Sequence, residues 1–357
     1  MNYLISGIGP GSSGVGRLMK ALIPEYTKRG YQVIFKRDEK SVREFLKEKK
    51  YFFALMEPIS RLYAKFHYYL KMKVITHSNI ILLHPQTVGF DVLINLVYKN
   101  NVSLYLMDNS FFCIRSYNMN PESHLECFHC VNNIDPLETC NPFPVRISKN
   151  KNIFFLQEIK KISKRITFLA QNRLQAELVK RHFGEDVALK IIGMDTKEFS
   201  FVSHLEKNYK SDIGYDVVYH GAPILEKGIS YVIDLAKQLP TYTFLIPSSE
   251  VSVKSIINQD LPDNISCKDI TWEQGLKEII ISAKLVINPS LWSACIEGAL
   301  LKSAYFNDNV ATVKTEYGYE NEITTIKNHL RLDKNPILAA NDIKLFFEKV
   351  HSLNKNH

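Results

Sequence analysis

Two charged residues in the second half of the chain, Lys227 and Glu297, each stand between an expected strand and an expected helix. Glu297 follows the apolar run Leu285–Ile287 and a Pro-Ser break, and an apolar helical stretch comes after it. Lys227 follows the expected strand Asp216–His220. Strand, tight turn and helix is where an open α/β sheet binds a phosphate, because the amides and the positive dipole end of the helix point outward there.

Both residues also have an ordinary interpretation. Glu297 can serve only the first turn of its helix, although it falls one residue past the capping-box position if Ser293 is the N-cap. An exposed Lys-Gly pair before a helix, such as Lys227-Gly228, is common. From these residues alone, phosphate chemistry and helix capping both remain open.

Alternating strands and helices surround these two residues, which predicts an α/β fold. The predicted strands are Tyr3–Ser6, Tyr31–Phe35, Asn79–His84, Val102–Met107, Ile166–Ala170, Val187–Ile192, Asp216–His220, Thr243–Pro247, Ile265–Lys268 and Leu285–Ile287. Helical stretches such as Val15–Arg29 lie between them.

The stretch Val286–Ser303 resembles a motif of the retaining glycosyltransferases of family 4, which have the two-domain GT-B fold. Pro289, Ser290, Glu297 and the apolar run after it match that motif in order. The family usually carries two glutamates there, and in this chain Ser293 stands at the first position. The loop is also shorter than the family's.

Other elements follow the family's order along nearly the whole chain. They are a glycine-rich turn with Gly7, Gly9, Gly14 and Gly16, Asp108 at a strand end, the phrase Gly193–Phe199 with Asp195 and Thr196, and the pairs His220-Gly221 and Lys227-Gly228. Two departures are Met107, where the family often has His, and Ala222-Pro223, where it often has an Arg.

The resemblance implies an α/β protein with two Rossmann-like domains facing an interdomain cleft, and donor binding in the second domain. Lys227 and the amides of a predicted 294–303 helix would hold the diphosphate, Glu297 would bind the ribose hydroxyls, and Asp108 would contact the acceptor. The remaining predicted contacts are Gly14, Gly16, Gly221, Gly228, Trp272, Ser290, Ala294, Cys295 and Ile296. Trp272 either stacks on the nucleobase or only packs. The donor would carry UDP or GDP, and catalysis would need no metal.

The domain boundary is expected near the phrase Gly193–Phe199, with a hinge at about Met194–Ser211. The first domain would comprise residues 1–197, with a cysteine-rich insert at 110–144, and a last helix at 341–357 would cross back to it. Residues 198–340 would form the second domain.

Four of the six cysteines cluster in the insert. Cys113, Cys127, Cys130 and Cys140 include a tight C-x2-C pair, which suits a structural zinc held by four thiolates. His124 and His129 are spare ligands. Four reduced cysteines in a long loop is the other interpretation.

Charge is unevenly divided. Residues 1–165 hold 24 Lys+Arg and 13 Asp+Glu, a net charge of +11, and the rest hold 21 and 24, a net charge of −3. A basic half can bind nucleic acid or an anionic membrane surface. Ser41–Lys73 mixes basic and aromatic residues, which fits a membrane-docking surface or an ordinary amphipathic helix with a solvated basic face. Without an RNA-binding signature, nucleic acid is the weaker choice.

The predicted function is therefore transfer of a sugar from a nucleotide donor to a lipid-linked or oligosaccharide acceptor, as in bacterial O-antigen or capsule assembly. The protein is expected in the cytoplasm, either free or peripheral on the inner face of the cytoplasmic membrane, because neither a signal peptide nor a long apolar run is recognisable. A nucleotide-sugar epimerase and a non-catalytic zinc-containing interaction protein are the alternatives. A dinucleotide site is disfavoured, because Ser12 ends the G-x-G-x-x-G pattern and Asp38 comes late.

Overall fold

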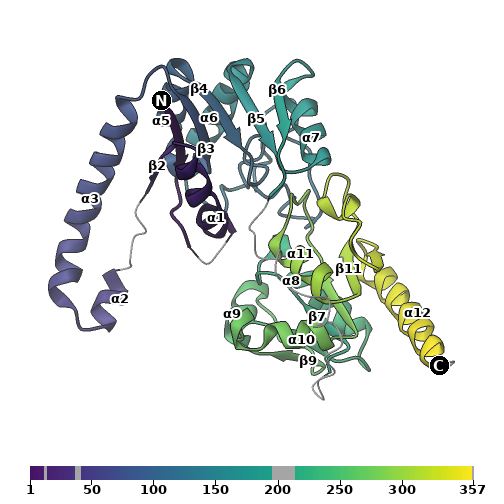
Figure 1. Cartoon of the computed structure of the whole chain (residues 1–357). Coiled ribbons are helices and arrows are strands. Elements are labelled where there is room, and N and C mark those ends of the chain that lie inside the picture. The colour runs from purple at the N-terminus through teal and green to yellow at the C-terminus, as the bar shows by residue number, and fades with distance from the viewer. Residues whose placement is uncertain (12–13, 37–41, 195–213, 356–357) are drawn as a thin grey trace. The chain divides into compact units, whose positions relative to one another are not determined.

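The chain divides into two compact units in the computed structural model, which describes residues 1–11, 14–36, 42–194 and 214–355. The first unit comprises Met1–Ser116 and His129–Lys197, and the second comprises Tyr117–Phe128 and Glu198–His357. Each unit contains a six-stranded parallel sheet (Figure 1). Asp195, Thr196, most of the predicted hinge, Ser12 and Asp38 lie outside the described residues.

The first sheet has the strand order β2-β1-β3-β4-β5-β6. Its strands are β1 (Asn2–Ser6), β2 (Gln32–Phe35), β3 (Asn79–Leu83), β4 (Asn101–Tyr105), β5 (Ile166–Ala170) and β6 (Ala188–Ile191). The helices of this unit are α1 (Gly14–Lys28), α2 (Val42–Lys47), α3 (Tyr51–Lys73), α4 (Pro85–Val88), α5 (Phe90–Lys99), α6 (Lys149–Ile162) and α7 (Arg173–Phe183), with a 3-10 turn η1 (Ser163–Arg165). The central strands are apolar runs, as a parallel sheet covered on both faces requires.

The second sheet has the order β12-β11-β10-β7-β8-β9. Its strands are parallel, but successive strands are added on one side of β7 up to β9 and on the other side from β10 onward, so the strand order reverses between β7 and β10. Its strands are β7 (Val217–Tyr219), β8 (Phe244–Ile246), β9 (Ile265–Cys267), β10 (Leu285–Asn288), β11 (Asn309–Val313) and β12 (Asn328–Leu332). The helices are α8 (Ile229–Gln238), α9 (Glu250–Ile257), α10 (Leu276–Ser282), α11 (Gly298–Phe306) and α12 (Pro336–Lys355), with 3-10 turns η3 (Leu225–Lys227), η4 (Trp272–Gln274) and η5 (Tyr319–Asn321). Ligands of open α/β sheets bind at the carboxyl edge beside such a reversal.

The ten strands named from the sequence are all present, with ends shifted by at most a few residues. Apolar runs between turn residues identified them correctly because buried parallel strands have that pattern. Between β3 and β4 the helical segment is broken into α4 and α5 at Gly89, which has φ 116°. The strands β11 and β12 are additions to the predicted set.

Two segments lie in a different unit from the one expected. The terminal helix α12 belongs to the second unit, where it packs against α8 and β12, instead of joining the first domain. Tyr117–Phe128, from the middle of the cysteine-rich insert, also belongs to the second unit, and we call it the strap. Met119 of the strap is 1% exposed within the main apolar core of that unit. Burial of such apolar side chains is what fixes both segments there.

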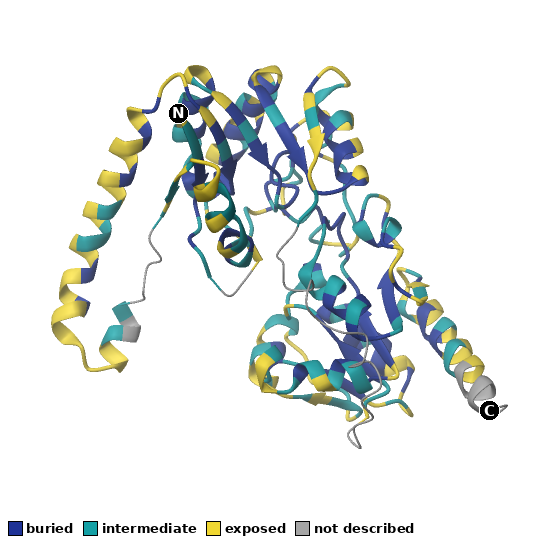
Figure 2. Cartoon of the chain, viewed as in Figure 1, coloured by how far each residue is buried: buried dark blue, intermediate teal, exposed yellow. Residues whose placement is uncertain are grey.

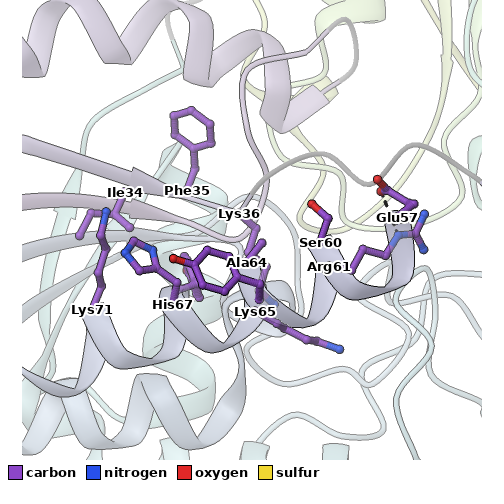
Figure 3. Close-up of a pocket in the computed structure, with 12 residues that line it drawn as sticks. Ile34, Phe35, Lys36, Glu57, Ser60, Arg61, Ala64, Lys65, His67 and Lys71 are labelled. Atoms are coloured by element: carbon purple, nitrogen blue, oxygen red, sulfur yellow. Dashed lines mark hydrogen bonds and ion pairs between the residues drawn. The ribbon is translucent and has the colours of Figure 1, made fainter. Parts of the chain in front are cut away.

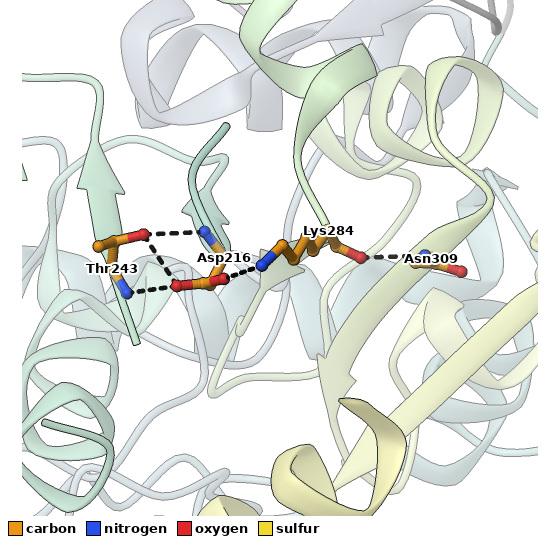
Figure 4. A network of polar contacts seen from close by, with 4 residues as sticks. All are labelled: Asp216, Thr243, Lys284 and Asn309. Carbon is orange, nitrogen blue, oxygen red and sulfur yellow. Dashed lines mark hydrogen bonds and ion pairs between the residues drawn. The ribbon is translucent and has the colours of Figure 1, made fainter. Parts of the chain in front are cut away.

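At the amino-terminal ends of its strands, the second sheet carries a network of polar contacts (Figure 4). Asp216 accepts hydrogen bonds from the Thr243 amide at 2.7 Å, the Thr243 hydroxyl at 2.9 Å and Lys284 Nζ at 2.7 Å. Burial acts to raise the pKa of Asp216, but the hydrogen bonds from Lys284 and Thr243 outweigh it, so the pKa lies below its usual value. Asn309 extends the network by donating to the Lys284 carbonyl at 2.9 Å. This network stabilises the sheet and leaves the carboxyl edge for function.

Helix α3 presents most of its apolar side chains to solvent instead of to the protein. The outward side chains recur at spacings of three and four residues, which places them on one face: Phe52, Leu55, Ile59, Leu62, Phe66 and Tyr69 are 42–73% exposed. We call this set the outward face of α3. Ala54, Glu57, Tyr68 and Met72 are the buried residues of the helix. Figure 2 shows α3 largely exposed along its length. The other interpretation above, an ordinary amphipathic helix with a solvated basic face, would instead bury the apolar face against the protein.

The part of the insert that remains in the first unit is held by a buried histidine. His182 on α7 is 1% exposed, and its Nδ1 accepts a hydrogen bond from the amide of Asn132 at 3.1 Å. Burial, helped by the charge of Lys160, lowers the pKa of His182 to about 3. The imidazole is therefore neutral in the folded chain at any pH above this value.

Acidification is expected to destabilise the first unit through His182. The unfolded histidine takes up a proton below about pH 6.5, whereas the folded one does so only near 3, so stability falls as the pH drops between these values. The loss amounts to about 2 kcal/mol at pH 5. Urea unfolding of the wild type and of His182→Gln at pH 7 and pH 5 measures it, because glutamine does not titrate. Identical pH dependence in the two proteins would contradict this assignment.

Candidate functional site

The loops that follow β7 and β10 meet at the point where the strand order of the second sheet reverses. The first loop runs from His220 to Gly228 and contains η3, and the second runs from Pro289 to Glu297. The two loops are joined by a hydrogen bond from the Leu291 amide to the Glu226 carbonyl at 3.0 Å. The Tyr219 hydroxyl, from fully buried β7, donates to the carbonyls of Ala222 and Lys227 and so fixes the shape of the first loop.

Lys227 and Glu297, the two residues singled out from the sequence, form an ion pair at this place. Lys227 Nζ contacts Glu297 Oε1, and the two side chains are 19% and 13% exposed. The Ser290 hydroxyl donates to Glu297 Oε2 at 2.6 Å, so both carboxylate oxygens have partners. A partly exposed cation and carboxylate side by side can exchange these partners for those of a ligand.

Two aromatic rings support the lysine. Lys227 Nζ lies 4.8 Å from the ring centroid of Trp292 and 5.4 Å from that of Tyr117, and the two rings are themselves 4.6 Å apart. Cation–π attraction of this kind holds the ammonium group over the rings without consuming its hydrogen-bonding capacity. Tyr117 belongs to the strap, so a residue far away in the sequence helps to position the lysine.

The helix after β10 begins later than predicted. Helix α11 starts at Gly298, and Glu297 is its N-cap residue with extended backbone, φ −104° and ψ 125°. Ala294, Cys295 and Ile296 therefore lie in the loop, and the predicted 294–303 helix is wrong at its start. The loop is held by its neighbours, because the Ala294 amide binds Trp292 O at 2.6 Å and the Ala294 carbonyl accepts from the Tyr319 amide at 2.8 Å.

The strap also fixes the β10–α11 loop by direct hydrogen bonds. Asn118, which is fully buried, accepts from the Ser293 amide at 3.0 Å and donates to the Ser293 hydroxyl at 2.9 Å. Glu126 accepts from the same hydroxyl at 2.6 Å and from the amide of Glu316 at 2.7 Å. Tyr117, Asn118 and Glu126 are residues that the sequence reasoning missed, since nothing local in the sequence connects them with a loop near position 293.

Asn118→Ala is expected to lower the free energy of unfolding of the second unit by about 2–4 kcal/mol, because the Ser293 amide and the Cys127 carbonyl lose a buried partner. Urea denaturation measures this loss. Asn141→Ala, at an exposed asparagine of the same insert, should change it by less than about 0.5 kcal/mol. Comparable losses in the two variants would show that the strap is not a specific anchor.

Trp272 packs within the second unit. Its ring is stacked on His220, with centroids 5.7 Å apart, and Lys302 Nζ lies 4.5 Å from its centroid. His220 in turn contacts the Ser303 hydroxyl through Nδ1 at 2.9 Å. The Trp272 ring therefore packs on neighbours of its own unit, as one of the two interpretations expected. Stacking of Trp272 on a nucleobase stays a prediction. Gly221 lies next to His220 in the same loop.

A second carboxyl group, Glu320, lines a small cavity together with Glu297 and Ser290. The cavity measures about 10 Å³, room for about one water molecule. Glu320 is 7% exposed and accepts the Thr315 amide at 3.0 Å. Burial raises the pKa of Glu320, while its hydrogen bonds partly oppose this. Sequence reasoning missed this residue because it follows β11, which was itself not predicted.

At the carboxyl edge of the first sheet, the predicted Asp108 lies near His84. Both line one small cavity of about 10 Å³, and Asp108 accepts the Ser110 amide at 2.9 Å. Burial lowers the pKa of His84, and the Asp108 carboxylate acts against this. In the glycine-rich turn, a Cβ on Gly16 would come within 2.8 Å of Gly11 Cα, whereas one on Gly14 would meet nothing within 4 Å.

The predicted zinc site finds no support. Within the described parts of the chain, no three His, Cys, Asp or Glu side chains are placed to hold a metal ion. All six cysteines are described, and none forms a disulfide. Cys127 belongs to the strap in the second unit, whereas Cys113, Cys130 and Cys140 belong to the first. Spacing along the chain carries no information about this division of the cysteines between the two units.

Similarity of fold places the chain among known structures. The Anabaena protein HepE, solved in complex with UDP and glucose, matches with a TM-score of 0.60 at 14% identity, over 98% of this chain and 91% of that one. A glycosyltransferase from Rickettsia africae matches with a TM-score of 0.48 at 12% identity, over 98% and 89%. No family model and no curated protein sequence matches the chain. The chain has the GT-B fold of two Rossmann-like domains, which the sequence predicted.

Proposed function

We propose that the protein is a retaining glycosyltransferase that moves a sugar from a nucleoside diphosphate donor to a lipid-linked saccharide acceptor. The observation that carries this proposal is the Lys227–Glu297 pair at the reversal point of the second sheet. Retention of configuration rests on the resemblance to family 4. HepE was solved with UDP and glucose, which supports UDP as the donor nucleotide.

In this proposal the bound donor replaces the contact between Lys227 and Glu297 with its own contacts to each of them. The diphosphate takes the ammonium group of Lys227, and the ribose hydroxyls donate to Glu297. Charge on the diphosphate grows as the bond to the sugar breaks, so a lysine fixed beside it stabilises the transition state more than the bound donor. Amides in the first turn of α11 add further donors, because the first amides of a helix have no partner within it. The proposal needs no zinc.

The acceptor side of the proposal concerns the first unit. Asp108, at the end of β4, is assigned to the acceptor. The outward face of α3, with Lys65, Lys71 and Lys73 on the same helix, supports contact with an anionic membrane surface. None of the helices in the described ranges is both long and apolar enough to span a bilayer. A surface-polysaccharide pathway such as O-antigen or capsule assembly would use this acceptor class.

The test begins with a thermal-shift screen against UDP, GDP, CDP and ADP, since a ligand of the native state raises the melting temperature. Stabilisation by UDP is expected, and it should disappear in Glu297→Gln. A UDP-sugar is then supplied with and without a lipid-linked acceptor. Release of UDP only with the acceptor supports transfer. Release or isomerisation without it would favour an epimerase, and no stabilisation by any nucleotide would favour a non-catalytic binding protein.

A further inference from the structure

A cavity of about 360 Å³ lies in the first unit between the end of β2 and helix α3. Its walls are Ile34, Phe35 and Lys36 on one side and α3 on the other (Figure 3). This volume falls in the range of small-molecule sites, about 300–1,000 Å³. It opens at the carboxyl end of β2, the sheet edge where ligands of open α/β sheets bind. Neither Lys227–Glu297 nor Asp108 lines it.

The charges of the cavity match an anion of more than one charge. Four cations line it against one carboxylate: the cations are Lys36, Arg61, Lys65 and Lys71, and the carboxylate is Glu57. Glu57 is 6% exposed and accepts from Arg61 Nε at 3.1 Å, so its charge is already matched. The remaining positive charge is more than the single negative charge of a phosphodiester can neutralise. It suits a diphosphate, which carries more negative charge and whose oxygens accept charge-assisted hydrogen bonds.

The floor of the cavity is rigidly built. Tyr68 is 7% exposed, and its hydroxyl donates to the Ser6 carbonyl at the end of β1 at 3.4 Å. Burial raises the pKa of Tyr68, so this phenol adds no negative charge. Lys36 donates to the Thr87 carbonyl and lies 5.6 Å from the Tyr68 ring. Lys36 and Tyr68 are thus tied to the backbones of α4 and β1, respectively, as a preformed site requires.

The rim of the cavity is apolar and leads to the outward face of α3. Tyr63 and Phe35 line the cavity and are 70% and 39% exposed. The outward face beyond them carries aliphatic side chains such as Leu55 and Ile59. An occupant that satisfies both surfaces has an anionic head and an apolar chain. We propose that the cavity binds the diphosphate group of a lipid diphosphate, whose chain passes Tyr63 toward the bilayer on which α3 rests.

Other occupants fit less well. Single-stranded nucleic acid would need cations along its phosphates beside the rings on which its bases stack, whereas the outward face carries three aromatic and three aliphatic side chains and no charge. A second copy of the chain packed on the same face would bring its Lys65, Lys71 and Lys73 toward those of the first, and like charges oppose association. The inference rests on the proposed function in one respect, because it identifies the lipid diphosphate with the acceptor.

The experiment compares two lysines of the last turn of α3. Lys71 lines the cavity, whereas Lys73 does not and lies 5.1 Å from the Tyr69 ring. Calorimetric titration of farnesyl diphosphate and of inorganic pyrophosphate into the full chain gives their affinities. The farnesyl compound should bind at least about tenfold more tightly than pyrophosphate, through its apolar chain. Lys71→Glu should weaken it by about tenfold or more, and Lys73→Glu by less than about twofold.

Three outcomes would overturn the inference. Equal losses in the two lysine variants would indicate charge attraction without a site. If pyrophosphate binds as tightly as farnesyl diphosphate, the apolar chain contributes nothing and the occupant is not a lipid. Displacement of farnesyl diphosphate by a short DNA duplex would assign the cavity to nucleic acid. UDP binding, measured in the same samples, separates this inference from the proposed function: UDP binding without farnesyl diphosphate binding refutes only the inference, and the reverse refutes only the donor assignment.

Discussion

Replacing Lys227 by glutamine is expected to lower the rate of sugar transfer at least about a hundredfold while the protein stays folded. The ammonium group is the only cation in contact with Glu297 among the described residues, and our proposal places the leaving diphosphate there. Loss of one fixed donor that stabilises developing negative charge lowers kcat by about 10²- to 10³-fold. Steady-state kinetics with a UDP-sugar and a lipid-linked acceptor measure the effect.

The kinetic pattern separates chemistry from donor binding. Lys227→Gln should act mainly on kcat, because charge on the diphosphate is largest in the transition state. Glu297→Gln should act mainly on the KM of the donor, since ribose contacts are made equally in the ground state. Both residues are partly buried, so the melting temperature of each variant must be compared with that of the wild type.

Lys277 offers a matched control for Lys227. It belongs to the same unit, is partly buried and has its Nζ 5.1 Å from the Phe306 ring, but it lies on α10, outside the two loops. Lys277→Gln should leave kcat within about twofold. Equal activity of the Lys227 and Lys277 variants would remove Lys227 from the mechanism and leave its pair with Glu297 as a structural contact.

The sequence was sufficient for the features that depend on local pattern. Apolar runs gave the strands, and the positions of Lys227 and Glu297 after two of them placed both at the carboxyl edge, where the structure joins them. The sheet order that makes β7 and β10 neighbours is not a local property. The GT-B resemblance implied two Rossmann-like domains without naming a strand order, so that order comes from the structure.

Features that depend on distant contacts could not be predicted in this way. The start of α11 is set by Asn118, Trp292 and Tyr319, which hold the preceding loop away from helical geometry. The direction in which α3 turns its apolar face depends on what it packs against, not on its own periodicity. The cysteine spacing suggested a metal because it carries no information about which unit each cysteine belongs to.

Gly228→Ala is expected to be the most damaging small substitution in the second unit. Gly228 has φ 75°, a left-handed conformation that costs an alanine about 1–2 kcal/mol. A Cβ there would also overlap the carbonyl oxygen and the ring of Pro289, at the start of the neighbouring loop. Neither contact is the end of a flexible side chain, so the two loops must separate. A total loss of about 3 kcal/mol or more is expected in urea denaturation.

The same displacement should abolish donor binding, because Gly228 follows Lys227 directly and Pro289 precedes Ser290, the hydrogen-bond partner of Glu297. Gly214→Ala is the matched control. That glycine is exposed, precedes β7 outside the two loops and has no left-handed φ, and an added Cβ there meets nothing within 4 Å, so the variant should keep UDP binding and change stability by less than about 0.5 kcal/mol. Equal stability and equal UDP binding of the two alanine variants would mean that the loops are free to move apart. In that case the close approach of Gly228 to Pro289 would not be what brings Lys227 to Glu297.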